Sequence, residues 1–132
     1  MKPRKHSIIS AKKYGGRWEE YQKFHDWMDQ SKVAHADVKH RAILHHSLGI
    51  FIGEQVFGPV FINSEGRTLD VRDILEQHVM DDLGWIPSPS DYFKSMEIQD
   101  WFGGMRKTTR RVPLTLKSTT GPTWEPNDDK EY

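Results

Sequence analysis

The stretch AILHHSLGIFIGEQVF, residues 42–57, is apolar on nearly every side of a helix, and it decides the fold that the sequence predicts. We predict one helix over residues 33–57, and its apolar second half places this helix at the centre of the core. Gly49 and Gly53 lie four residues apart on it, which lowers helix propensity but allows another helix to approach closely. The rest of the chain must then supply elements that cover a buried helix.

Amphipathic segments on both sides of this stretch predict further helices. Apolar residues recur at three- and four-residue spacing over residues 18–30 and 71–83, and Gly84 is a typical residue to end the second of these helices. A fourth helix is predicted over residues 89–101. The sequence SPSD at its start, residues 88–91, contains a capping serine, a proline for the first turn and an acid.

Two short segments, residues 60–62 and 68–71, flank the turn-forming tetrapeptide NSEG and predict a β-hairpin. The expected fold is therefore mainly α: a compact bundle of about four helices with one short β-hairpin and an extended C-terminal tail. We divide the chain into a basic N-terminal arm over residues 1–16, a helical core domain over residues 17–104, and an extended tail over residues 105–132 that is first basic and then acidic.

The composition excludes several classes of protein. The chain has 132 residues, enough for one domain, and it has no cysteine, so disulfides, thiolate metal sites and cysteine nucleophiles are ruled out. No apolar run approaches the roughly 18 residues of a membrane span, and the first residues, MKPRKHSIIS, lack the apolar core of a signal peptide. We therefore expect a soluble, cytoplasmic protein without a membrane partner.

Charge is distributed unevenly, although the 19 basic and 19 acidic residues balance. Residues 1–13 and 105–117 are basic and contain no acid, whereas residues 70–100 are rich in acids. The basic ends suit a polyanion such as nucleic acid, a nucleotide, a protein partner or a second copy of the chain; alternatively they are solvated or fold back onto the acidic centre. The partner-binding candidates in the tail are Arg106, Lys107, Arg110, Arg111 and Trp124.

The pattern that carries chemistry is a histidine and a carboxylate on the inward face of each of three predicted helices. Projection at about 100° per residue places these side chains on the same side as the apolar residues. The pairs are His25 with Asp29, Asp37 with His40, and His78 with Asp82. Ser47 and Glu54 lie on the same side of the predicted central helix as His40.

Imidazole and carboxylate groups from facing helices are suitable ligands for a divalent metal. The metal-ligand candidates are His25, His40, His78, Asp29 and Asp37, and the catalytic candidates are Asp82, Glu54 and Ser47. Nitrogen and oxygen donors suit Zn²⁺, Mn²⁺ or Fe²⁺, and such an ion can activate water for hydrolysis of a phosphoester or a nucleotide. The alternative is structural, because a buried histidine bonded to a carboxylate satisfies two polar groups without a metal.

The remaining histidines are predicted outside this site. His45 and His46 project to different sides of the predicted central helix from His40, so we expect them to pack and to form hydrogen bonds. His35 is expected to be exposed, and His6 lies in the N-terminal arm, where its partners are not predicted. The density of histidines in this stretch is therefore weaker evidence for a metal than the matching faces of three helices.

The stretches YQKFHDWMDQSK, HRAILHHSLGIF and EQHVMDDLGWIPSPSDYF together resemble a family of small phage and bacterial proteins that is described only as a domain of unknown function. The resemblance covers about residues 6–101 and brings no activity with it. It implies a phage or mobile-element context, in which short proteins often act on nucleic acid, nucleotides or host defence. The recurring positions of the family correspond here to His25, Trp27, Asp29, Lys32, His40, Arg41, His45, His46, Gln77, His78, Asp82, Leu83 and Gly84.

Adjacent His25 and Asp26 also resemble the paired ligands of HD-type phosphohydrolases, which are helical enzymes with one or two metals. In those enzymes an upstream histidine and a distant aspartate complete the site. His6 is a poor match for the first, and Asp81 or Asp82 is an acceptable match for the second. Two functions remain open: a metal-dependent hydrolase, and a non-enzymatic module that binds nucleic acid or protein through its tail, in host interaction or virion assembly.

Overall fold

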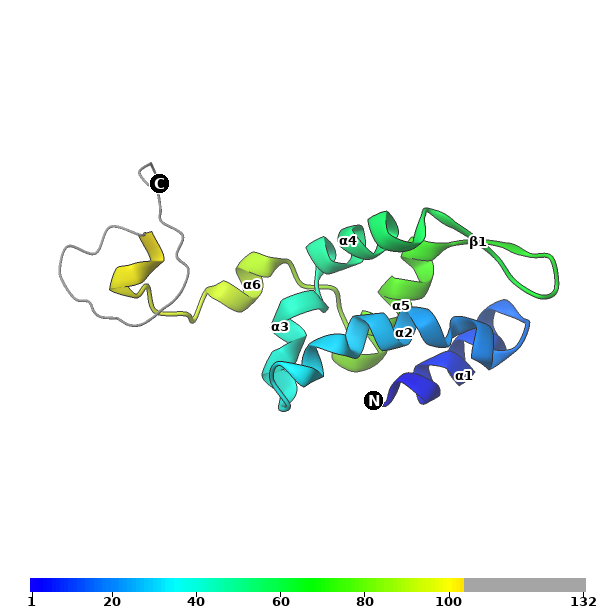
Figure 1. The fold of residues 1–132 in the computed structure, drawn as a ribbon, viewed down its shortest axis with the longest axis horizontal. Coiled ribbons are helices and arrows are strands. Elements are labelled where there is room, and N and C mark those ends of the chain that lie inside the picture. Colours follow the sequence, from blue (N-terminus) through cyan, green and yellow to red (C-terminus); the bar gives the residue numbers. More distant parts are fainter. Residues whose placement is uncertain (104–132) are drawn as a thin grey trace, which may run out of the picture. The chain divides into compact units, whose positions relative to one another are not determined.

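The computed structural model describes residues 1–103 of the chain (Figure 1). The chain divides into two units, of which the first covers residues 1–94 and the second begins at residue 95. The α-helices of the first unit are α1 (Pro3–Tyr14), α2 (Gln22–Asp29), α3 (Arg41–Leu44), α4 (Ser47–Phe57), α5 (Val71–Leu83) and α6 (Pro89–Phe93). Its strands are β1 (Val60–Ile62) and β2 (Thr68–Asp70), and its 3₁₀-helical turns are Trp18–Tyr21, Gln30–Val33 and Val38–His40. A 3₁₀-helical turn at Asp100–Gly103 belongs to the second unit.

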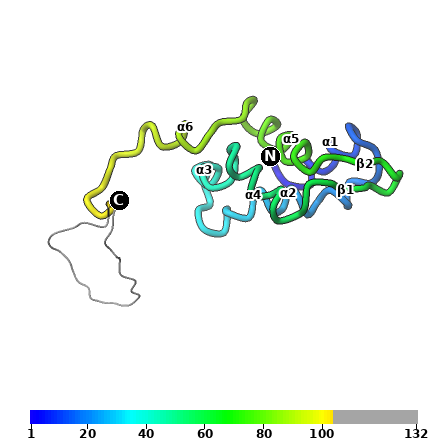
Figure 2. Tube along the Cα trace, turned by 90° about the horizontal axis from the view of Figure 1, so that it is seen from above, coloured from blue at the N-terminus to red at the C-terminus, as the bar shows by residue number. Residues whose placement is uncertain are grey.

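The fold of the described residues is mainly helical with one antiparallel hairpin, which confirms the predicted fold class. Strands β1 and β2 pair with each other, and Phe61 lies opposite Leu69. Both views show the hairpin at one end of the helical unit (Figures 1 and 2). Asn63 closes the predicted turn, because its side-chain oxygen accepts hydrogen bonds from the backbone N–H groups of Glu65 and Arg67, both at 3.0 Å.

Helix α5 is the central element of the first unit, since it contacts α1, α2 and α4. Its buried residues Ile74 and Leu75 belong to the same apolar core as Phe24 and Met28 of α2. The helix ends as predicted at Gly84, whose φ of 80° lies in the left-handed region that glycine adopts readily.

The predicted helix over residues 33–57 is broken, which corrects the prediction from the sequence. His45 and His46 separate α3 from α4, and both take non-helical backbone angles. His46 caps α4: its Nδ1 accepts a hydrogen bond from the N–H of Gly49 at 3.0 Å, and its Nε2–H donates to the carbonyl of Ala42 at 3.1 Å. The cap satisfies backbone groups that the end of one helix and the start of the next leave without helical partners.

Helix α4 is not the buried centre that its apolar sequence predicts. Only Gly49, Ile50 and Gly53 are buried on it, because one narrow face approaches α5. Large apolar side chains on its other faces are exposed, and these are Leu48, Phe51, Ile52 and Val56. Although α4 is apolar, neither it nor another helix in the described part of the chain is long and apolar enough to cross a membrane.

Two further segments differ from their predicted form. Residues 3–14, within the predicted N-terminal arm, form a full helix that contacts α2 and α5. Helix α6 starts with the predicted hydrogen bonds between Ser88 and Asp91, but it ends at Phe93 and not at Trp101. None of its residues is buried, so packing does not support a longer helix.

Replacing Gly49 with alanine tests the tight junction between α3 and α4. A Cβ at this position would overlap the backbone carbonyl of Leu44, so this backbone would have to move. We expect G49A to lower the free energy of unfolding by about 1–3 kcal/mol, in spite of the higher helix propensity of alanine. Urea denaturation followed by circular dichroism measures the change. Gln55→Ala, at an exposed position of the same helix, should change stability by about 0.5 kcal/mol or less. If G49A were as stable as the wild type, the close contact between position 49 and the backbone of Leu44 would be contradicted.

Candidate metal centre

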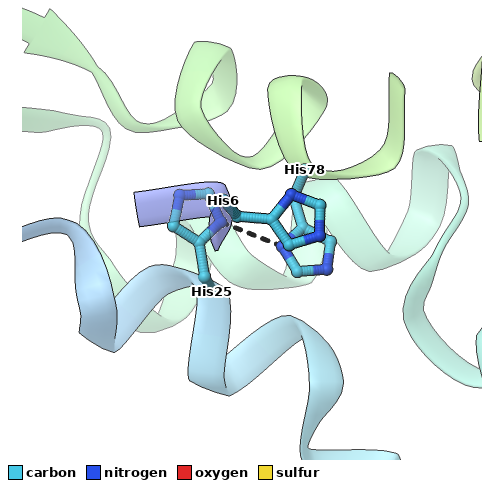
Figure 3. Close-up of side chains that lie close together, drawn as sticks. All are labelled: His6, His25 and His78. Carbon is cyan, nitrogen blue, oxygen red and sulfur yellow. Dashed lines mark hydrogen bonds between the residues drawn. The ribbon is translucent and has the colours of Figure 1, made fainter. Parts of the chain in front are cut away.

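Ionisable side chains from α1, α2, α5 and the α3–α4 junction meet in the interior of the first unit. His6 comes from α1, His25 from α2 and His78 from α5, and Figure 3 shows their rings gathered together. All three are fully buried, and the ring centroids of His6 and His78 lie 3.8 Å apart. The cluster also contains Asp29, His45, Asp81 and Asp82.

Four residues of this cluster form what we name the His/Asp cage: Asp29, His45, His78 and Asp82. Nε2 of His45 lies 3.0 Å from Oδ2 of Asp82 and 3.3 Å from Oδ1 of Asp29. Nε2 of His78 lies 3.2 Å from the same oxygen of Asp29 and 3.4 Å from the same oxygen of Asp82. A tetrahedral metal with bonds of about 2.0–2.1 Å keeps its ligand atoms about 3.3 Å apart. Four of the six donor-to-donor distances therefore match a tetrahedral ligand set, and all four atoms lie within 4.8 Å of one another.

A chain of hydrogen bonds sets the tautomer of His78. Nε2 of Gln77 donates to Asp81 at 2.8 Å, and Oε1 of the same amide accepts the hydroxyl of Ser10 at 2.5 Å. Ser10 then accepts from Nε2–H of His25 at 2.8 Å, which leaves Nδ1 of His25 as an acceptor. Nδ1–H of His78 donates to that atom at 2.9 Å, along the dashed line in Figure 3. A neutral His78 therefore carries its lone pair on Nε2, the atom that faces the cage.

This lone pair points at two carboxylates, and the arrangement calls for a cation. Without a proton, Nε2 of His78 cannot donate to Asp29 or Asp82, although it lies within 3.4 Å of an oxygen of each. Nε2 of His78, Oδ1 of Asp29 and Oδ2 of Asp82 are all electron-rich, and at these distances they repel one another unless a proton or a metal ion lies among them. In metal sites, a hydrogen bond on the far nitrogen typically fixes the tautomer of a ligating histidine, and the chain through His25 and Ser10 does this here.

Burial and neighbouring charges shift the pKa values of the cluster in directions that suit metal ligands. Burial lowers the pKa of His25 to about 2 and the pKa of His78 to about 4, so both rings are neutral near pH 7. Burial alone would raise the pKa values of Asp29 and Asp82, but a hydrogen bond from His45 and, at Asp82, a further one from His6 outweigh it and hold both pKa values well below the usual range. Burial alone would lower the pKa of His45, but its hydrogen bonds to these two carboxylates outweigh burial and raise that pKa.

His6 orients the cage from outside it. Its Nε2 lies 3.2 Å from Oδ1 of Asp82 and its Nδ1 lies 3.2 Å from Oδ2 of Asp81, so the other oxygen of Asp82 faces the cage.

Three of the buried residues of α1 are polar, and these are His6, Ser7 and Ser10. Apolar periodicity does not detect a buried face that is polar, which is why sequence reasoning left His6 without a place.

His45 is a residue of the cage that sequence reasoning missed. A continuous helix would turn its ring away from the predicted site, whereas the break at the junction gives it φ −83° and ψ 65° and directs its Nε2 into the cage. The hydroxyl of Tyr92 donates to the carbonyl of His45 at 2.9 Å and supports this backbone position. The one signal for His45 was its place among the recurring positions of the family that the sequence resembles.

The structure brings together four of the predicted site residues: His25, His78, Asp29 and Asp82. His40 is buried, but its Nδ1 bonds the hydroxyl of Ser31 at 3.0 Å, and it is not part of the cage. Its ring centroid lies 5.4 Å from that of His45. His40 therefore borders the cage and packs against the ring of His45.

Asp37, Ser47 and Glu54 lie outside the cluster, which corrects the prediction that they face inward with His40. Asp37 is exposed and accepts a hydrogen bond from the N–H of Lys39 at 2.8 Å. Ser47 is exposed at the start of α4, and Glu54 forms an ion pair with Arg72 at 3.2 Å. Asp37 precedes the turn Val38–His40, whereas Ser47 and Glu54 lie on α4 beyond the break, so the three do not form one inward face with His40.

The remaining candidates also lie apart from the cage. Asp26 is exposed and accepts a hydrogen bond from Gln22 at 2.9 Å, so His25 and Asp26 do not form the paired ligands that their adjacency suggests. The tail candidates lie outside the described residues, and these are Arg106, Lys107, Arg110, Arg111 and Trp124.

Fold and cluster together define a small helical domain with a buried centre of histidine and aspartate. The chain belongs to the family described as domain of unknown function DUF6915, whose model matches residues 1–102, and this confirms the resemblance to a family without a known function. No curated protein matches the chain, and no solved structure matches it. The family assigns no activity, so the function must be argued from the geometry of the centre.

Asp82→Asn tests whether the buried carboxylate stabilises the metal-free protein. The pKa of Asp82 lies well below its usual range, because hydrogen bonds from histidines outweigh the effect of burial; its ionised form therefore favours the folded state near pH 7. Leaving its buried partners without this charge should lower the free energy of unfolding by about 3–5 kcal/mol. Urea denaturation in the presence of EDTA measures the loss. Asp37→Asn, at an exposed carboxylate, is the matched control and should cost about 0.5 kcal/mol or less. Equal losses in both variants would contradict the role of Asp82.

Proposed function

We propose that this protein binds one divalent metal ion through Asp29, His45, His78 and Asp82. The observation that carries the proposal is the geometry of the cage: four donor-to-donor distances of 3.0–3.4 Å, close to those around a tetrahedral ion. The lone pair that the hydrogen-bond chain leaves on His78 supports it independently.

The donor set favours Zn²⁺ among the divalent metals. Two imidazoles and two carboxylates suit Zn²⁺, Mn²⁺ or Fe²⁺, and the tetrahedral spacing is typical of Zn²⁺. The two ionised carboxylates also neutralise the two charges of such an ion, so that burying the complete site leaves no net charge inside the domain.

A bound ion would link segments that are far apart in the sequence. Asp29 comes from α2, His45 from the α3–α4 junction, and His78 with Asp82 from α5. The side chains of all four are exposed by 5% or less, which is typical of closed structural sites. We therefore propose that the metal stabilises the fold, because the site does not exist in the unfolded chain and the free energy of binding contributes to folding.

The hydrolase expected from the sequence needs a metal with an open coordination position for water or substrate. The burial of the cage and the places of Ser47 and Glu54 outside it favour a structural ion over a hydrolytic one. Release of phosphate from a nucleotide or a phosphodiester by the metal-loaded protein, and not by Asp82→Asn, would reverse this preference.

Binding of nucleic acid or of a protein partner through the basic tail stays a prediction of the sequence. The residues that it invokes lie beyond residue 103. Loss of such binding on deletion of residues 105–132 would support this second role, and it would leave the metal site unaffected.

Removal of the metal is the direct test of the proposal. Protein purified without a histidine tag should contain about one ion per chain by elemental analysis, and Asp82→Asn should contain none. Saturating Zn²⁺ should raise the Tm of EDTA-treated protein by more than about 10 °C, since the ion binds the folded state. Asp37→Asn and Glu54→Gln should keep both the ion and the shift. A wild-type protein that binds no metal and melts at the same temperature with and without chelator would refute the proposal.

Ser10→Ala tests the hydrogen-bond chain behind His78. Removing the hydroxyl breaks the bonds to His25 and Gln77, so the tautomer of His78 is no longer fixed. We expect metal affinity to fall by about 10–100-fold in a chelator competition assay. Ser7→Ala is the matched control, because Ser7 is also buried on α1 but bonds Pro3 and Gln22. A similar loss in both variants would indicate general damage to α1 and not an effect on His78.

A further inference from the structure

Arg41 lies beside the His/Asp cage at the start of α3, and its guanidinium is incompletely satisfied. Its Nη2 lies 3.7 Å from Oδ1 of Asp82, which is an ion-pair distance but longer than a hydrogen bond. That oxygen already accepts from Nε2 of His6 at 3.2 Å. The Nε of Arg41 is buried and has no hydrogen-bond partner among residues 1–103. A buried N–H of this kind requires an acceptor that the described side chains do not supply.

Lys32 flanks the other carboxylate of the cage. Its Nζ lies 3.6 Å from Oδ2 of Asp29, an oxygen that also has no hydrogen-bond partner in the described part of the chain. The side chain of Lys32 is 43% exposed and that of Arg41 is 23% exposed, so both cations reach from the cage towards solvent. Each carboxylate therefore turns one oxygen to the cage and the other to a cation.

Metal binding changes the charge balance of this arrangement. In the metal-free cluster, Lys32 and Arg41 offset the charges of Asp29 and Asp82. A divalent ion contributes +2, which Asp29 and Asp82 cancel with −2. The N-terminal ammonium of Met1, 3.3 Å from Oδ1 of Asp82, and the carboxylate of Asp81 offset each other, so Lys32 and Arg41 leave a local charge of +2. A dianion would neutralise it.

We infer that Arg41, assisted by Lys32, forms an anion position beside the metal that takes a phosphate group, either free or as a phosphomonoester. The inference rests on the proposed metal site and extends it. A phosphate dianion matches the local charge of +2, and its oxygens match the forked donors of a guanidinium. Asp81 bonds His6 and Gln77, and among the described residues it forms no ion pair with Arg41 or Lys32 that an anion would have to displace.

Calorimetric titration of the full-length, metal-loaded chain with inorganic phosphate and with a nucleoside monophosphate tests the inference. Arg41→Lys keeps the charge but removes Nε and the fork. We expect it to weaken binding of both probes by about tenfold or more, the loss that corresponds to one charged hydrogen bond. Arg72→Lys is the matched control, because Arg72 pairs with Glu54 away from the cage, and it should bind as the wild type does. Tighter binding of the monophosphate than of free phosphate would identify a phosphomonoester as the ligand.

The outcomes separate the two proposals. A wild-type chain that contains its metal but binds neither probe, or binds both equally well after Arg41→Lys, overturns the anion position and leaves the metal site intact. A chain without metal overturns both. If Arg41→Lys fails to fold, ³¹P relaxation of phosphate on the wild-type protein decides: Co²⁺ in the cage should accelerate it strongly relative to Zn²⁺, and equal rates would overturn the inference.

Discussion

The burial of two carboxylates, Asp29 and Asp82, is the constraint on which the rest of the structure depends. Their side chains are exposed by 5% and 2%, and an ionised carboxylate in such a position is strongly unfavourable without partners. Helix α1 supplies His6 and the α3–α4 junction supplies His45 as their hydrogen-bond partners. The placement of α1 and of the junction therefore follows from the hydrogen bonds that these carboxylates require as much as from apolar packing.

The distribution of polar and apolar residues is unusual for so small a domain. Histidines and aspartates fill interior positions, while α4 leaves Leu48, Phe51 and Val56 largely in solvent. Replacing a buried ion pair with apolar residues is often neutral or stabilising, and this chain has apolar side chains that it does not bury. The cluster is therefore poorly explained by stability of the metal-free protein, and better explained by the metal ion that we propose it binds.

The sequence predicted the parts of the fold and site that depend on local regularity. The pairs His25 with Asp29 and His78 with Asp82 lie within single helices, so helical projection was sufficient to turn them inward. The break before α4 could not be found in this way, because the cap at His46 interrupts a stretch whose composition is uniformly apolar. That break separated Ser47 and Glu54 from His40 and brought in His45. Helix α1 was missed for the opposite reason, since its buried face is mostly polar.

The spacing of the cage atoms fits a metal ion at the centre better than it fits a proton. A proton can join two heavy atoms in a hydrogen bond, so in the metal-free protein a proton on His45 bridges to one carboxylate oxygen at a time. The cage presents four donor atoms, and each histidine nitrogen lies 3.0–3.4 Å from both carboxylate oxygens. A single ion satisfies all four atoms together, including the lone pair that the chain through Ser10 and His25 holds on His78. The arrangement thus matches a metal ligand set more closely than it matches a set of hydrogen bonds.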